Sequence, residues 1–208
     1  KTPSGKSVLI NGGPSVTILS DELGRRVSAF NRKLDWLVIA VSTCGTLRGA
    51  RQAVAERGLK TRILAVDAAG SVLYGKRGVR LLPGHGAGTI PAHMADDLAD
   101  EAALVTDADC VAGCRALVTR EAILAGASSG GIVAAVNRYR HLWAAQARVA
   151  LILPDRGDRY LDTVYDDAWC IRHFGAVPEL EHSMDLSSAA SSAKSSLPLT
   201  EQHTAHAT

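Results

Sequence analysis

The sequence predicts an α/β protein in which a largely parallel sheet carries helices on both faces. Apolar residues form unbroken runs at 36–41, 63–66 and 149–153, which is typical of strands buried on both sides. Segments of helical character separate these runs, as expected when parallel strands alternate with crossover helices. Hydrophobic residues make up 47% of the 208 residues, which is enough to build a core.

The N-terminal residues are the hardest to assign. Two short apolar runs, SVLI at 7–10 and SVTIL at 15–19, flank the turn signal NGGP. They fit either a weak hairpin or two strands. We therefore treat residues 1–33 as a poorly defined N-terminal segment.

The regular pattern begins at Asp35. We expect strands near 35–41, 62–67, 102–105 and 149–153. We expect helices at 46–58, 110–122, 128–147 and 158–169. Gly58 ends the first helix, and Asp107 or Asp109 caps the second. The Gly-rich stretch 70–91 is expected to be mostly loop, and loops of that length are usually functional or mobile.

These elements predict a single α/β domain over residues 34–178. From residue 179 the chain is rich in Ser and Ala and poor in large apolar residues. That composition is typical of disorder, so residues 179–208 are expected to be a disordered tail.

The composition argues against several kinds of partner. A formal net charge of +2 implies no strong attraction to nucleic acid, and no apolar run approaches the ~18 residues of a membrane span. Four cysteines are too few for a disulfide scaffold, which favours reduced thiols in a cytoplasmic protein. Cys110 and Cys114 share a helix face without further ligands nearby, so we expect buried small side chains and no metal site.

Two motifs occupy turns that lead into helices. Ser42, Thr43, Cys44, Gly45 and Thr46 lie between a strand and a helix, where backbone amides and the helix dipole can hold an anion. The same residues also fit a plain turn with Thr46 as the N-cap. The second motif, GASSGG at 126–131, also fits simple helix capping.

Two further motifs are loops. GHGAGTIP at 84–91 suits a segment that closes over a ligand. LPDRGDRYL at 153–161 follows a strand, where α/β sheets usually build their sites. We expect its Asp155 and Asp158 to act as structural caps, and His85 to be either an exposed loop histidine or a contact for a substrate anion.

In order and spacing, the four motifs resemble the C-terminal half of the cysteine synthase family, fold-type II enzymes that use pyridoxal 5'-phosphate (PLP). STCGT is similar to the family's GTGGT loop, GHGAGTIP to GxGAGxIP, GASSG to GISSG and PDRGDRYL to PSxGERYL. The resemblance covers residues 34 to 175. STCGTLRG and DADCVAGCR look closest to N-(2-amino-2-carboxyethyl)-L-glutamate synthases, which serve siderophore pathways, and to cysteine synthases that use O-phosphoserine.

The resemblance implies roles for particular residues. Ser42, Thr43, Cys44, Gly45 and Thr46 would hold the PLP phosphate, with Cys44 acting as a spacer. Ser128 would face the pyridine nitrogen and leave it largely unprotonated, with Ser129 as the alternative. Gly86, Ala87 and Gly88 would border the substrate and move on closure. We also expect Ser128 and the phosphate loop to lie on one side of the sheet.

The family's Schiff-base lysine is not found in this sequence, so the catalytic residue is unknown. None of Lys1, Lys6, Lys33, Lys60, Lys76 and Lys194 has the family's SxKDR context. We therefore expect a fragment of a PLP enzyme that performs β-replacement on O-phosphoserine or O-acetylserine and is a homodimer when intact. The alternative is a non-catalytic domain that binds PLP phosphate or a protein partner. A dinucleotide-binding domain is less favoured, because no GxGxxG follows a strand.

Overall fold

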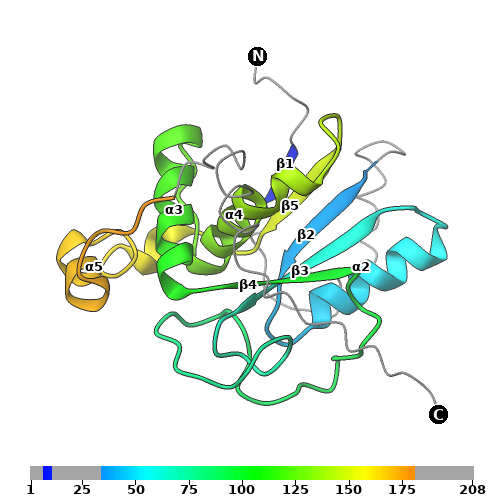
Figure 1. Ribbon diagram of the computed structural model, residues 1–208, viewed down its shortest axis with the longest axis horizontal. Helices are drawn as coiled ribbons and strands as arrows, with labels where there is room; N and C mark the ends of the chain where they lie inside the picture. Colours follow the sequence, from blue (N-terminus) through cyan, green and yellow to red (C-terminus); the bar gives the residue numbers. More distant parts are fainter. Residues whose placement is uncertain (1–6, 11–33, 181–208) are drawn as a thin grey trace, which may run out of the picture.

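The computed structural model describes residues 7–10 and 34–180, which fold around a parallel sheet (Figure 1). Its strands are β1 (Ser7–Ile10), β2 (Trp36–Ala40), β3 (Arg62–Ala68), β4 (Glu101–Val105) and β5 (Val149–Leu153). In this part of the chain the sheet has five strands in the order β1-β5-β2-β3-β4. Every neighbouring pair is parallel. The predicted fold class is confirmed.

Helices cover both faces of this sheet (Figure 1). Helix α2 (Gly45–Glu56) lies on one face, and α3 (Asp107–Glu121) and α4 (Ala127–Tyr139) lie on the other. Strand β2 shows why: Leu37 and Ile39 pack in the cluster that contains α2, whereas Trp36 and Val38 pack in the cluster that contains α3 and α4. A strand buried on both faces needs apolar residues at every position.

Helices α3 and α4 approach each other through glycines. A Cβ atom on Gly130 would collide with the carbonyl oxygen of Cys110, and one on Gly113 would collide with the carbonyl oxygen of Gly130. Cys110 and Cys114 are buried in this contact, at 2% and 0% exposure, so the prediction that they pack as small side chains is confirmed.

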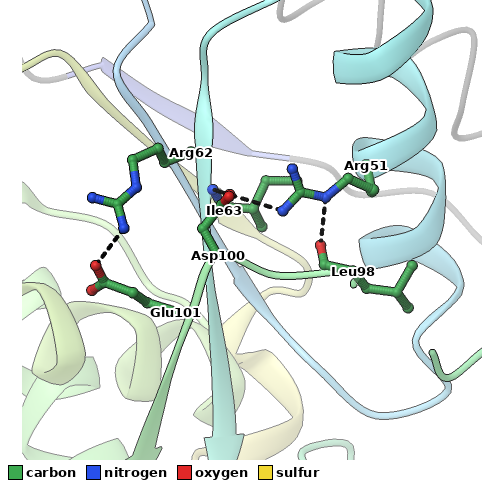
Figure 2. Close-up of polar contacts among 6 residues, drawn as sticks. All are labelled: Arg51, Arg62, Ile63, Leu98, Asp100 and Glu101. Carbon is green, nitrogen blue, oxygen red and sulfur yellow. Dashed lines mark hydrogen bonds and ion pairs between the residues drawn. The ribbon is translucent and has the colours of Figure 1, made fainter. Parts of the chain in front are cut away.

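A polar cluster ties α2 to the sheet where β3 and β4 begin (Figure 2). The Asp100 carboxylate accepts a hydrogen bond from Ile63 N (2.6 Å) and forms a salt bridge with Arg51 (2.8 Å). Arg51 Nε also donates to the Leu98 carbonyl oxygen (3.2 Å), while Arg62 pairs with Glu101 beside it (2.7 Å). The polar cluster holds the chain in place as it enters β4.

The segment between β3 and β4 contains neither helix nor strand, as predicted for 70–91. It gathers at one end of the sheet, at the bottom of the view in Figure 1. Asp67, at the end of β3, is fully buried and accepts hydrogen bonds from Ala68 N (2.9 Å) and Tyr74 N (3.0 Å). The buried carboxylate fixes the start of this loop.

Two predicted helices were wrong in extent. The predicted helix 128–147 ends as α4 at Tyr139 and continues only as the short 3-10 turn η1 (Arg140–Leu142), after which Trp143 stacks on Trp36 with ring centroids 5.4 Å apart. The predicted helix 158–169 is instead a 3-10 turn, η2 (Gly157–Tyr160), followed by helix α5 (Asp167–Phe174).

The predicted cap of α3 was right only in part. Thr106 is the N-cap, and Asp109 completes a capping box with it. Asp107 instead accepts hydrogen bonds from Leu81 N (2.9 Å) and Leu82 N (3.1 Å) in the long loop. Asp107 therefore stabilises the loop rather than the helix start.

Some predictions lie partly outside the described residues. The run at 7–10 is a strand, β1, which pairs in parallel with β5. The second run, at 15–19, lies outside the described residues, as do Lys1, Lys6, Lys33, Lys194 and the predicted tail beyond residue 180.

Candidate functional site

The order in which the chain adds strands to the sheet reverses between β2 and β5: β3 and β4 lie on one side of β2, and β5 lies on the other. Strand β2 leads into α2 on one face, whereas its neighbour β5 is entered from α4 on the opposite face. Open α/β sheets bind ligands outside the carboxyl ends of their strands at such a switch point. The four motifs follow strands or begin helices at this edge, which makes it the candidate site.

The Ser42–Thr46 loop offers an uncapped helix start. No side chain caps α2, and its first turn has no acidic residue, whereas α3 is closed by a full capping box. Thr43 is exposed, and Gly45 and Thr46 are half-buried. The positive end of the α2 dipole is therefore accessible to an anion.

Cys44 turns its thiol away from this opening. Its backbone is left-handed (φ 61°), its side chain is buried, and its Sγ lies 3.6 Å from Met94 Sδ. Burial, and then the charge of Asp67, raises the pKa of the thiol to about 11. A thiol that stays protonated at neutral pH is a poor nucleophile, which agrees with the predicted spacer role.

Hydrogen bonds fasten the loop at Gly86 and Ala87 to the phosphate loop and to the start of the β3–β4 segment. Ser42 Oγ donates to the Gly86 carbonyl oxygen (3.0 Å), and Gly86 N donates to the Val41 carbonyl oxygen (2.8 Å). Ala87 N donates to Ser71 Oγ (3.0 Å), and its carbonyl accepts from Val72 N (3.0 Å). The backbone groups of both residues are thus used within the protein, a pattern that favours a fixed segment over the expected closing loop.

The expectation that His85 is an exposed loop histidine was wrong, and its burial argues against the alternative of a contact with a substrate anion. It is 2% exposed, and its Nε2 lies 2.9 Å from the Val66 carbonyl oxygen. Its Nδ1 lies 3.7 Å from Cys110 Sγ. Burial lowers the pKa of the imidazole, which favours a neutral ring that donates from Nε2.

The GASSG and PDRGDRYL segments lie side by side. Gly126 N donates to the Asp155 carbonyl oxygen (3.1 Å), and Ala125 bridges Arg156. The Asp155 carboxylate lies against Gly126, where a Cβ would collide with it, and accepts a hydrogen bond from Tyr160 (2.9 Å). The expectation that Asp155 and Asp158 are caps was wrong, because the N-cap of η2 is Arg156 and no side chain caps this turn.

Contacts at two points join the loop at 84–91 to the GASSG and PDRGDRYL segments. A Cβ on Gly84 would lie 3.9 Å from the Tyr160 hydroxyl, and a Cβ on Gly131 would lie 2.9 Å from His85 Cε1. Ser128, in the first turn of α4, is 5% exposed. The two helix starts belong to opposite faces of the sheet, so the expectation of a common face was wrong; what they share is its carboxyl edge.

Three residues of this region were not recognised from the sequence. Arg80 Nη1 donates to the His85 carbonyl oxygen (2.7 Å), and Ser71 and Tyr160 make the contacts described above. An arginine six residues before Gly86 gives no signal of that role in the sequence. Tyr160 could have been noticed, since it stands within the fourth motif.

The donors and acceptors of this edge suit a ligand with an anionic end. The uncapped start of α2 supplies amides, and Thr43 and Thr46 supply hydroxyls. Near the start of α4, Ser129 Oγ and Asp155 Oδ1 are buried and, within the described part of the chain, have no hydrogen-bond partner. Residues 12–155 match the family model described as "Pyridoxal-phosphate dependent enzyme".

The chain belongs to this family of pyridoxal-phosphate dependent enzymes. The match begins at residue 12, ahead of residue 34 where the sequence resemblance starts. The cofactor of the family is pyridoxal 5'-phosphate, which has a phosphate at one end and a ring nitrogen at the other.

Curated relatives carry the name suggested by the motifs. The chain is 45% identical over 153 residues to an N-(2-amino-2-carboxyethyl)-L-glutamate synthase from Ralstonia nicotianae, covering 73% of this chain and 44% of that protein. It is 43% identical over 152 residues to the enzyme of the same name from Cupriavidus metallidurans, covering 70% and 45%. The chain thus spans less than half the length of these relatives.

Solved structures share the fold. An O-acetylserine dependent cystathionine β-synthase from Helicobacter pylori superposes with a TM-score of 0.62 at 25% identity, covering 71% of this chain and 48% of that one. An O-ureido-L-serine synthase gives a TM-score of 0.67 at 23% identity, covering 74% and 52%. The fold of this PLP-dependent family is therefore that of cysteine synthase-like enzymes.

Within the described residues, no helix is long and apolar enough to cross a membrane.

Proposed function

We propose that this chain is the cofactor-phosphate half of a PLP enzyme that performs β-replacement on an activated serine. The substrate class is O-phosphoserine or O-acetylserine, and the product is an amino acid or a siderophore precursor. The names of the 45% and 43% identical relatives support this choice, as does the O-acetylserine-dependent enzyme among the structures. The four unpaired, buried cysteines are typical of a reducing compartment, which favours the cytoplasm.

The observation that carries the proposal is the uncapped start of α2 at the switch point of the sheet. Amides of Cys44, Gly45 and Thr46 would hold the cofactor phosphate, and the Thr43 and Thr46 hydroxyls would add donors. Ser42 would act indirectly, because its hydroxyl is hydrogen-bonded to the Gly86 carbonyl oxygen. An anion at a helix start interacts with the dipole as well as with the amides.

Ser128 would face the ring nitrogen from the start of α4. When bound, the cofactor supplies an electron sink for chemistry at the substrate's α-carbon. The chain's own residues hold the phosphate, orient the ring and form one wall of the site. Because the backbone groups of Gly86 and Ala87 are already bonded, Gly88 is the member of the substrate loop most suited to contact the substrate.

The lysine that bonds the cofactor would come from outside this chain. Among the described lysines, Lys60 precedes β3 at the opposite edge of the sheet, and Lys76 is exposed. The intact enzyme would pair this half with a lysine-bearing half and associate as a homodimer. A non-catalytic domain would bind the phosphate equally well but would gain no β-replacement activity when a lysine-bearing half from a relative is added.

The test uses 4-deoxypyridoxine 5'-phosphate, which has the ring and the phosphate but no aldehyde to react with surface lysines. Calorimetry should show that the chain binds this compound at least about tenfold more tightly than unphosphorylated 4-deoxypyridoxine, since hydrogen bonds to a charged group each contribute ~1.5–3 kcal/mol. Thr46→Ala should weaken binding about tenfold. Thr119→Ala, on an exposed site at the far end of α3, should leave it unchanged. Equal binding of both compounds would contradict the proposal.

A further inference from the structure

Arg80 lies against the loop that would border the substrate. Its Nη1 donates a hydrogen bond to the His85 carbonyl oxygen (2.7 Å). A Cβ on Gly86 would lie 2.9 Å from Nη1, and a Cβ on Gly88 would lie 3.7 Å from Nη2. The two glycines therefore make room for the guanidinium, which packs against the backbone of the loop.

The Nη2 end of this guanidinium borders open space at Gly88. Apart from the chain neighbours of Gly88, Arg80 Nη2 is the one described atom within 4 Å of the position that a Cβ on Gly88 would take. The corresponding position at Gly86 is enclosed by Ser71 and Ala68 as well. Gly88 is the loop residue most suited to contact the substrate, so Arg80 offers donors beside that contact.

The positive charge of Arg80 is not balanced within the described part of the chain. None of the salt bridges between described residues includes Arg80. Asp107 instead accepts hydrogen bonds from the amides of the two residues that follow Arg80, and residues 68–95 contain no Asp or Glu. A half-buried guanidinium has five N–H donors, and a charge withdrawn from water is normally paired. An anionic ligand would supply the missing partner.

From this placement we propose that Arg80 is a specificity-determining residue, whose guanidinium binds the phosphate of an O-phosphoserine substrate. The inference rests on the proposed function, in which the activated serine is O-phosphoserine or O-acetylserine. The two compounds share the α-amine and the α-carboxylate and differ in the leaving group, which is anionic in the first and neutral in the second. A guanidinium forms charge-assisted, bidentate hydrogen bonds with a phosphate, so Arg80 favours the first compound.

The test measures substrate preference in the chain loaded with saturating 4-deoxypyridoxine 5'-phosphate, which occupies the cofactor phosphate site. The amide resonances of Gly88 and Thr89 in the 15N-labelled chain report binding during separate titrations with O-phosphoserine and O-acetylserine. In the unsubstituted chain, O-phosphoserine should bind about tenfold more tightly than O-acetylserine, because a hydrogen bond to a charged group contributes enough free energy for that ratio.

Two substitutions separate the charge of Arg80 from its structural contact. Arg80→Gln removes the charge but retains an N–H donor for the His85 carbonyl oxygen, and it should abolish the preference by weakening O-phosphoserine alone. Arg80→Lys keeps the charge without the bidentate geometry and should show a smaller preference. A purely structural role for Arg80 would weaken both compounds equally. Arg77→Gln, the matched control, removes the same charge from an exposed site in the same segment and should leave the preference unchanged.

The outcomes are distinct. Equal affinities in the unsubstituted chain, no binding of O-phosphoserine, or a full preference in Arg80→Gln would overturn the inference and leave the proposed function standing. Loss of the preference in Arg77→Gln would also overturn it, since the general charge of the segment would then be responsible. If Arg80→Gln does not fold, an undiminished preference in Arg80→Lys overturns the inference and a smaller one supports it. If the unsubstituted chain does not bind 4-deoxypyridoxine 5'-phosphate, the proposed function and the inference both fail.

Discussion

His85 shows how single residues determine local structure in this protein. Glycines on both sides have positive φ values, 79° at Gly84 and 72° at Gly86, a conformation that glycine adopts without strain. These turns direct His85 into the core, and Gly131 leaves room for it by lacking a Cβ. A histidine between glycines looks exposed in the sequence, because the space that accepts it comes from a helix 46 residues further along.

The buried imidazole makes stability depend on pH. Burial lowers the pKa of His85 below the ordinary histidine value of 6.5, so below about pH 6.5 the unfolded chain binds a proton that the folded chain does not. Stability should therefore be constant above that pH and fall as the pH drops, by at most about 1.4 kcal/mol per pH unit for this one group. Urea unfolding at pH 7.5 and 5.5 measures the loss.

His85→Gln should remove that part of the pH dependence, while His141→Gln, at an exposed site, should retain it. An unchanged pH dependence in His85→Gln would show that the folded chain accepts the proton on His85.

Cys44 gives a second prediction at this scale. Because burial, and then Asp67, raises its thiol pKa to about 11, alkylation by iodoacetamide should be slow at pH 8 and rise about tenfold per pH unit as thiolate forms. Peptide mapping by mass spectrometry follows the rate at Cys44. Rapid labelling at pH 8, or a rate that levels off near pH 9, would contradict the protonated, inward-facing thiol.

At the scale of elements, the strands were predictable and the last helix was not. Strands β2, β3 and β5 have apolar residues on both faces, and a continuous apolar run is a strong local signal. The segment 158–169 has helical composition, but Tyr160 bonds Asp155 and Tyr165 bonds the Ala125 carbonyl (2.6 Å). These contacts with remote residues hold the segment in turns until Asp166 caps α5. Asp166, with Gly175 at the other end, is the signal that would have located this helix.

The two carboxylates of the polar cluster in Figure 2, Asp100 and Glu101, should contribute unequally to stability. Asp100 bonds both a backbone amide and Arg51, at side-chain exposures of 24% for Arg51 and 30% for Asp100. Asp100→Ala should therefore cost ~1.5–3 kcal/mol. Glu101, at 37% exposure, forms a salt bridge with Arg62, at 51% exposure, and Glu101→Ala should cost ~0–1 kcal/mol. Equal losses in chemical unfolding would show that the Ile63 amide gains little from Asp100.

At the scale of the whole molecule, the candidate site is a consequence of parallel topology. Segments near residues 42, 86, 126 and 155 meet because loops after parallel strands and the helix starts beside them share one edge of the sheet. That convergence could be anticipated from the sequence. The sequence could not show that the two helix starts lie on opposite faces of the sheet, because strand order depends on pairings between β2, β3 and β5 that no local pattern encodes.

The central claim is that the start of α2 is a phosphate site within this edge. Backbone amide resonances of the 15N-labelled chain, recorded during titration with 4-deoxypyridoxine 5'-phosphate and with the unphosphorylated compound, test it most directly. We expect the amides of Cys44, Gly45 and Thr46 to shift with the phosphorylated compound only, and those of Ser128 and Ser129 to shift with it in the same titration. Shifts that leave residues 44–46 unmoved, or that are identical for the two compounds, would contradict the account.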